Sequence, residues 1–182
     1  MRKRLIVVIA LLPLLALPSA VSAKSHHPSG PVVPPPRVLA FDHMYGVDGP
    51  FVGDANPIRG VIGDELPWTI THFIKGRLDT NGHLRIQVKG LVFTDDPEVP
   101  PELQGKNDEE TFRALVSCTT EVSNTEVGTA NVTTDGFAAN VEGDSDIDAF
   151  VELPNPCIAP IVFILSGSED KWFAVTGFES ED

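Results

Sequence analysis

The chain has 182 residues and a net charge of −13, from 26 acidic and 13 basic side chains. A field of this sign repels nucleic acid and anionic lipid, because phosphate binding depends on clustered Lys and Arg. We therefore expect no nucleic acid partner, and the length favours one domain.

The first 23 residues have the pattern of a cleavable secretory signal peptide. A positive stretch at residues 2–4 precedes an apolar run at 5–17, and small residues at 19–23 allow cleavage after Ala23. The run is shorter than the roughly 20 apolar residues of a membrane span. We therefore expect a secreted, extracytoplasmic chain with no membrane association after cleavage, an uncleaved anchor being the alternative. Cleavage removes three basic residues and no acidic one, so the net charge changes from −13 to −16.

Residues 24–37 are rich in proline and predict an extended linker. Cleavage after Ala23 would leave a free amine on Lys24, followed by Ser25 and His26. An amine, two backbone amides and the third-position imidazole form the square plane of nitrogens that Cu(II) and Ni(II) prefer. His26 is thus a candidate metal ligand at the mature N-terminus, the alternative being a disordered tail. We expect no other cofactor.

Residues 38–182 are predicted to form a single β domain. Frequent Gly and Pro between residues 38 and 68 allow only short strands and tight turns there. The clearest element is a hairpin at residues 68–93, where apolar and polar residues alternate along both strands.

Residues directly opposite each other in a hairpin share a face, so the register must pair apolar with apolar. A two-residue turn at Asn81-Gly82 would place Leu78 opposite Arg85. A three-residue loop, Thr80-Asn81-Gly82, places Leu78 opposite Leu84 instead, with Gly82 at positive φ. We predict the three-residue loop.

The same register pairs Ile74 with Val88 and His72 with Gly90. His72 is the one histidine of five that falls on a predicted core face. We interpret it as a buried, hydrogen-bonded residue packed against glycine rather than a catalytic group.

The outer face of the hairpin is predicted to carry Lys75, Arg77, Arg85 and Lys89, with Arg77 directly opposite Arg85. Two like charges in this position repel unless an anion lies beside them. The favoured explanation is that the acidic loop at residues 94–110 folds over this face and covers Phe73, Leu91 and Phe93. The alternative is an exposed site for an anionic ligand.

Further period-two strands are predicted near residues 112–118, 129–133, 137–141, 147–153, 158–165 and 172–176. No stretch has the pattern of an amphipathic helix. About eight short strands indicate an all-β fold, a single antiparallel β-sandwich, with a small β-barrel as the alternative. An even cysteine count in an exported chain predicts a disulfide between Cys118 and Cys157.

Five sequence segments together resemble those of a group of small exported bacterial proteins of uncharacterised function. They are MYGVDGPFVGDANPIRGVIGDELPW at residues 44–68, GHLRIQVKGLVF, FRALVSC, GDSDIDAFVELPNPCIAPIVF and WFAVTG. The resemblance implies an export signal, one compact domain and the pairing of Cys118 with Cys157. It implies no catalytic or binding residues.

Motifs for catalysis are missing from the sequence. It contains no G-x-S-x-G elbow, and none of the five histidines has a catalytic signature. The acidic segment 144–148 resembles a calcium loop, but Ala149 stands where an EF-hand needs glycine, so a solvated sheet face is the preferred interpretation.

The leading hypothesis is therefore a secreted, non-catalytic β domain with a binding or scaffolding role and an unknown partner. The alternative is a secreted hydrolase or carbohydrate-binding module in which Trp68 and Trp172, and also Tyr45, contact sugars. Two carboxylates in a tryptophan-lined cleft would favour the alternative.

Overall fold

The computed structural model describes residues 33–177, in which one 3-10 turn is the only helical element. Of the eleven strands, three have two residues and the other eight have five or more, which confirms the predicted all-β fold of about eight strands. In chain order they are β1 (Arg37–Phe41), β2 (Tyr45–Gly46), β3 (Ile62–Gly63), β4 (Trp68–Asp79), β5 (His83–Phe93), β6 (Thr111–Ser123), β7 (Glu126–Thr133), β8 (Phe137–Ala138), β9 (Ser145–Phe150), β10 (Ile158–Ser166) and β11 (Lys171–Val175), with η1 (Gly49–Phe51) after β2.

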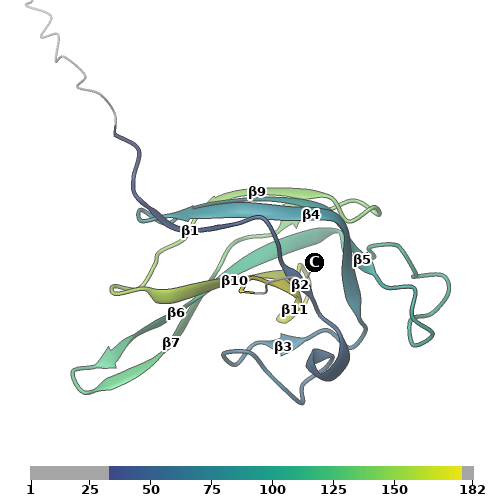
Figure 1. Ribbon diagram of the computed structural model, residues 1–182, viewed down its shortest axis with the longest axis horizontal. Helices are drawn as coiled ribbons and strands as arrows, with labels where there is room; N and C mark the ends of the chain where they lie inside the picture. The colour runs from purple at the N-terminus through teal and green to yellow at the C-terminus, as the bar shows by residue number, and fades with distance from the viewer. Residues whose placement is uncertain (1–32, 178–182) are drawn as a thin grey trace, which may run out of the picture. The chain divides into compact units, whose positions relative to one another are not determined.

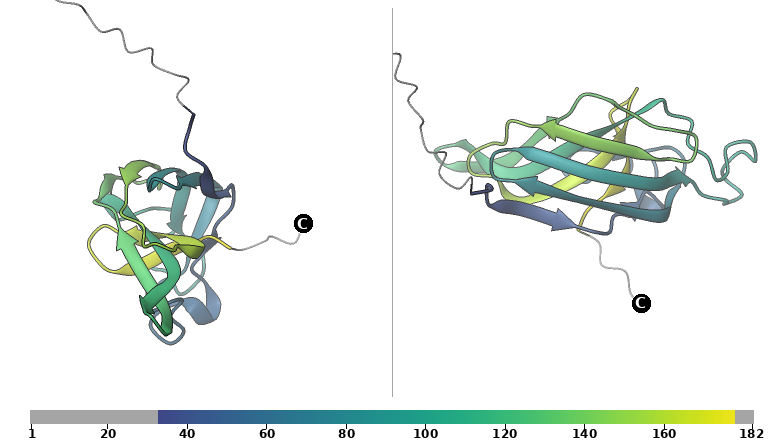
Figure 2. Two further views of the ribbon diagram at one scale, coloured as in Figure 1. Left: turned by 90° about the vertical axis from the view of Figure 1, so that its left-hand side faces the viewer. Right: turned by 90° about the horizontal axis from the view of Figure 1, so that it is seen from above.

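The strands form two sheets that lie one above the other (Figure 1). The four-stranded sheet has the order β1-β4-β5-β9 and is antiparallel throughout; its strands lie side by side when seen from above (Figure 2). The larger sheet has the order β2-β11-β10-β6-β7, with β8 beside β6 and with β3 parallel to β11. The predicted antiparallel sandwich is therefore present.

Period-two patterning explains how the two sheets bury one core. On the inner face of the β4–β5 hairpin, Ile74 and Leu78 of β4 and Val88 of β5 are all buried. Strand β10, whose sequence is apolar almost throughout, lies between β11 and β6, and both of its faces are covered at residues 162–165, which are all buried. At one end of the core the ring of Trp68 stacks on Phe173 at a centroid distance of 3.9 Å.

The turn between β4 and β5 has the predicted register. Leu78 lies opposite Leu84, Ile74 lies opposite Val88, and Gly82 has a φ of 80°. The strand pairing and the positive φ of Gly82 both agree with the three-residue loop Thr80-Asn81-Gly82, so the prediction is confirmed.

A β-bulge changes the register farther along the hairpin. Between Ile70 and Phe73 the pairing shifts by one, so that Thr71 and His72 together oppose Gly90, which has a φ of 76°. Thr71 and His72 are the two residues of the bulge, where the regular alternation of the strand is interrupted. His72 is exposed, and its predicted place in the core is wrong.

The bulge also reverses the orientation of the end of β5. Leu91 and Phe93 were predicted to face outward, but both are buried, and the ring of Phe93 lies 4.1 Å from that of Trp68 between centroids. The outer face of the hairpin therefore has less apolar surface to cover than the sequence suggests.

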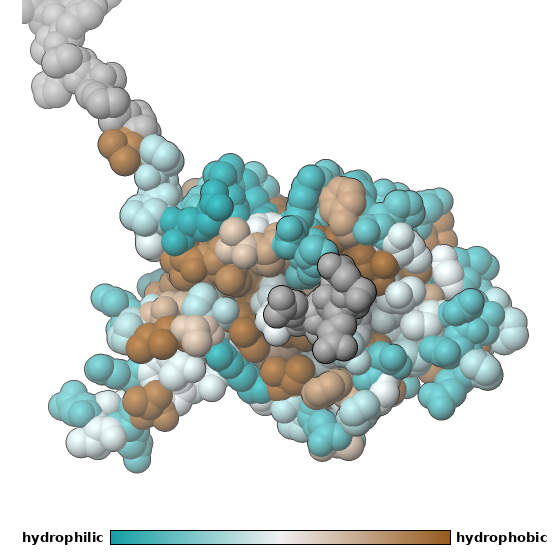
Figure 3. All heavy atoms as spheres, viewed as in Figure 1, coloured by the Kyte–Doolittle hydropathy of each residue, from teal (hydrophilic) through white to brown (hydrophobic). Residues whose placement is uncertain are grey.

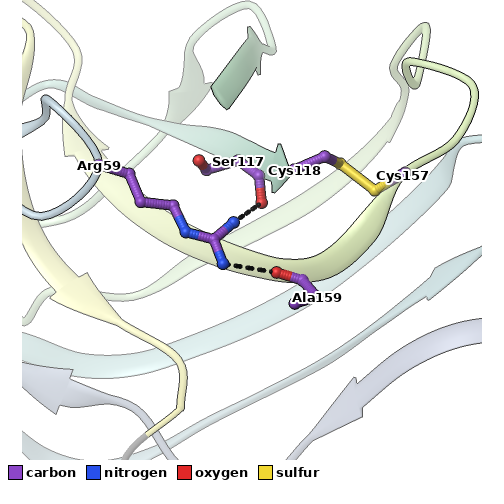
Figure 4. The surroundings of a disulfide bond; sticks show 5 residues. All are labelled: Arg59, Ser117, Cys118, Cys157 and Ala159. Atoms are coloured by element: carbon purple, nitrogen blue, oxygen red, sulfur yellow. Dashed lines mark hydrogen bonds between the residues drawn. A yellow bond between two sulfur atoms is a disulfide. The ribbon is translucent and has the colours of Figure 1, made fainter. Parts of the chain in front are cut away.

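Cys118 of β6 and Cys157, just before β10, are joined by a disulfide with a Cα–Cα distance of 5.0 Å, as the sequence predicts. Figure 4 shows that Arg59 lies beside this bridge. Its guanidinium donates to the carbonyl of Ser117 at 2.9 Å and to that of Ala159 at 2.8 Å. The covalent bridge and the arginine thus link the same two strands.

The predicted signal peptide, most of the predicted linker and His26 lie outside the described residues. Among residues 33–177, no helix has the length and apolar character needed to cross a membrane.

Candidate functional site

The outer face of the four-stranded sheet gathers charged side chains from three strands. Arg77 of β4 lies opposite Arg85 of β5, as predicted. Strand β9 adds Asp148 opposite Arg85 and Asp146 opposite Gln87. Hydrophilic residues crowd the top of Figure 3, where Figure 1 places β4 and β9. The sequence predicted the cations of this face but not their acidic neighbours.

The acidic loop at residues 94–110 lies at the opposite end of the hairpin. The amide of Thr94 donates to the carbonyl of Pro67, and that of Asn107 donates to the carbonyl of Val141. Contrary to expectation, the loop does not line the basic face. Leu91 and Phe93, which the loop was expected to cover, lie in the core instead.

A shallow furrow of about 560 Å³ crosses this outer face. Its floor includes backbone of Gly76, Ile86 and Ile147, since both isoleucine side chains are buried in the core. Its charged lining residues are the basic Arg37, Lys75, Arg77 and Arg85 and the acidic Asp42, Asp146 and Asp148.

The two opposed arginines share one carboxylate. Asp79 is only 5% exposed, and its Oδ2 lies 3.2 Å from Arg85 Nη2 and 3.7 Å from Arg77 Nη2. The Nε atoms of both arginines are buried without a hydrogen-bond partner. Each guanidinium has five N–H donors, and the side chains of Arg77 and Arg85 are 41% and 37% exposed, so the exposed donors of the pair can reach the oxygen atoms of a ligand.

Two carboxylates of the acidic segment at residues 144–148 bond to side chains and backbone of the neighbouring strand β5. Asp144 accepts hydrogen bonds from the amide of Gly90 at 3.0 Å and from Lys89 Nζ at 3.2 Å. Asp148 lies 2.6 Å from His83 Nε2. Across residues 33–177, no group of three or more acidic, His or Cys side chains is arranged to hold a metal ion.

A second, smaller pocket of about 210 Å³ lies at the other end of the core, and we call it the Trp68 pocket. Rings of Trp68, Phe93 and Phe173 lie against it together with five carboxyl side chains. The acidic lining residues are Asp64, Glu65, Asp108, Glu109 and Glu169. Sequence analysis did not predict this pocket, because its acids come from three separate loops and follow no period.

The acidic side chains of the Trp68 pocket differ in pKa and in their hydrogen-bond partners. Burial raises the pKa of Asp64 to about 6, although its Oδ2 accepts a 2.8 Å hydrogen bond from Trp68 Nε1. Burial also raises the pKa of Asp108. A hydrogen bond from Lys171 lowers the pKa of Glu65, and the hydroxyl of Ser166 donates to Glu109 at 2.7 Å.

The raised pKa of Asp64 predicts a pH-dependent stability. The unfolded chain loses this proton near pH ~4, whereas the folded chain keeps it to about pH 6. The free energy of unfolding should therefore fall as the pH rises through this window. Asp64→Asn keeps an oxygen acceptor for Trp68 and removes the titration. We expect its Tm, relative to that of the wild type, to rise between about pH 4 and 6 and to level off above. A difference in Tm that stays constant from about pH 4 upward would contradict this assignment.

Two tryptophans considered for sugar contact are core residues. Trp68 is 2% exposed and Trp172 is 0% exposed, so neither offers a ring face to a ligand.

Comparison with known proteins yields no match: no family model, no curated protein and no solved structure matches the chain.

Proposed function

We propose that the chain is an exported, non-catalytic β domain that binds its ligand in the furrow on the outer face of the four-stranded sheet. The observation that supports this most directly is the Arg77–Arg85 pair. Two guanidinium groups share the single carboxylate of Asp79, and the side chains of Arg77 and Arg85 are still 41% and 37% exposed. A ligand that supplies oxygen acceptors could bond to the exposed N–H groups of this pair.

The chemistry of the furrow favours binding over catalysis. Arginine stays protonated in proteins, so Arg77 and Arg85 can hold oxygen atoms but cannot act as a nucleophile or a general base. The furrow is also shallow, whereas catalytic sites usually exclude water from the reacting atoms.

Two features support export. The N-terminal 23 residues have the signal-peptide pattern. The Cys118–Cys157 disulfide is the kind of bond that persists in oxidising compartments.

Fragment binding followed by NMR tests the location of the site even while the ligand is unidentified. We expect a library of small soluble polar fragments to shift backbone amides of β4, β5 and β9 around Arg85. Arg85→Gln should reduce these shifts, because it removes the positive charge and leaves two of the five N–H donors. Lys106→Gln removes one positive charge from the distant loop and serves as the charge-matched control, which should leave them unchanged.

A secreted hydrolase is the competing candidate, and the Trp68 pocket is the observation in its favour. The pocket places Asp64, whose pKa is raised to about 6, against a tryptophan and beside other carboxyl groups, and perturbed pKa values often mark catalytic acids. Its volume is below the roughly 300–1,000 Å³ of typical ligand sites. Fragment shifts confined to this pocket would overturn the furrow proposal and favour the hydrolase.

A further inference from the structure

Phe150 forms a fixed aromatic platform two residues along β9 from Asp148, which lines the furrow. This last residue of β9 is 69% exposed. Its ring stacks on the imidazole of His83, with centroids 4.4 Å apart and an interplanar angle of 13°. His83 is in turn held by Asp148, 2.6 Å from its Nε2. One ring face is thus packed and the other is open to solvent, which distinguishes Phe150 from an ordinary exposed apolar residue.

Polar side chains beside this platform alternate donors with acceptors. Arg85 lies opposite Asp148, and the next outward-facing pair is Gln87 opposite Asp146. Each pair sets N–H donors next to carboxylate oxygens across two strands. A hydroxyl group both donates and accepts hydrogen bonds, so neighbouring hydroxyls on one ligand match these pairs.

A second aromatic ring lies toward the other end of the same face. Phe73 is 38% exposed, and Lys75 Nζ lies 4.7 Å from its ring centroid. Phe73 is paired with Lys89, six residues along β5 from His83, a span of about 20 Å in an extended strand. The outer face is therefore long and polar, with an aromatic ring toward each end.

The charges of the furrow argue against a polyanion. Its lining carries four basic and three acidic side chains, and Asp79 lies buried between two of the arginines. The face is thus close to neutral, and the net charge of −13 on the chain repels anionic polymers at long range. An uncharged polar ligand needs no excess of positive charge in the furrow, and the net negative charge of the chain does not repel it.

We propose that the furrow binds a neutral, hydroxyl-rich polysaccharide, with a sugar ring stacked on Phe150 and its hydroxyls bonded to Arg85 and Asp148. The inference rests on the proposed function, since it names the ligand of the same furrow. The C–H faces of a sugar ring supply the apolar surface that an open aromatic ring can pack against. A shallow furrow across several strands suits an extended chain better than a compact small molecule, which usually needs an enclosing pocket.

Native electrophoresis in polysaccharide-containing gels tests this proposal, together with a glycan array. The probes are dextran, xylan, soluble starch and galactomannan as neutral chains, and alginate and dextran sulfate as acidic ones. We expect at least one neutral chain to retard the protein. Phe150→Leu should weaken that binding about tenfold, because it removes the ring face against which the sugar packs.

Two further variants keep the result interpretable. Phe150→Tyr keeps the ring and should retain binding, whereas Phe150→Leu keeps an apolar side chain without the ring. Val127→Ala removes apolar surface that is 72% exposed on β7 of the other sheet and should have no effect. Matching thermal unfolding curves show that all three variants are folded.

Three outcomes would overturn the carbohydrate assignment: retardation by the acidic chains alone, binding that Phe150→Leu leaves unchanged, or no binding in any gel and on the array. Fragment mapping separates this failure from that of the proposed function. Amide shifts around Arg85 without glycan binding would leave the furrow as the site and exclude the polysaccharide. An absence of amide shifts around Arg85 would overturn both the furrow as the binding site and the polysaccharide as its ligand.

Discussion

Loss of the Cys118–Cys157 bridge is expected to lower the free energy of unfolding by about 4 kcal/mol. The bridge joins residues 39 apart, and in the chain-entropy model a closed loop of this length restricts the unfolded chain strongly. Cys118 of β6 is also fully buried, and the register between β6 and β10 shifts between Ile158 and Ile161, close to the bridge. Urea denaturation of the Cys118→Ala/Cys157→Ala double variant measures the loss.

Reductant provides the matched control for this prediction. It should destabilise the wild type and leave the double variant unchanged, because the variant has no disulfide to reduce. Two free thiols in the mature protein, detected by alkylation and mass spectrometry under non-reducing conditions, would contradict the assigned bridge. Equal free energies of unfolding for the double variant and the wild type would contradict the expected stabilisation by the bridge.

Gly82→Ala is expected to destabilise the domain by about 3 kcal/mol, from backbone strain and steric overlap together. The φ of 80° at Gly82 lies in the left-handed region, which alone costs alanine about 1 kcal/mol. A Cβ at this position would also lie 2.0 Å from the carbonyl oxygen of Val151. The backbone just after β9 would have to move, which strains the 3.0 Å hydrogen bond from Val151 N to the Gly82 carbonyl.

Gly105→Ala separates the two contributions. Gly105 has a φ of 68°, and a Cβ added there would have no neighbour within 4 Å, so this variant should lose only about 1 kcal/mol. Equal losses at both positions would show that the close approach to Val151 is unimportant. Since Phe150 directly precedes Val151, Gly82→Ala should also displace the aromatic platform and weaken ligand binding.

The sequence by itself determined the class of the fold and the register of its central turn. Strict alternation in β4 and β5 allows only pairings that keep Leu78 and Leu84 on one face, because a slip of one residue would expose the whole apolar set. The same local rule predicted Arg77 opposite Arg85. The count and placement of Cys118 and Cys157 sufficed for the bridge.

Tertiary structure alone decided what surrounds that hairpin. The bulge opposite Gly90 was not predictable from alternation, because it interrupts the period on which the prediction rests, and it moved His72 outward and Phe93 inward. Strand β9 is distant in sequence from β5, so its pairing, which places Asp148 opposite Arg85 and Phe150 opposite His83, depends on long-range packing. The Trp68 pocket likewise needs three loops to converge. Local periodicity reports which face a side chain occupies, but which elements become neighbours depends on how the two sheets bury their shared core.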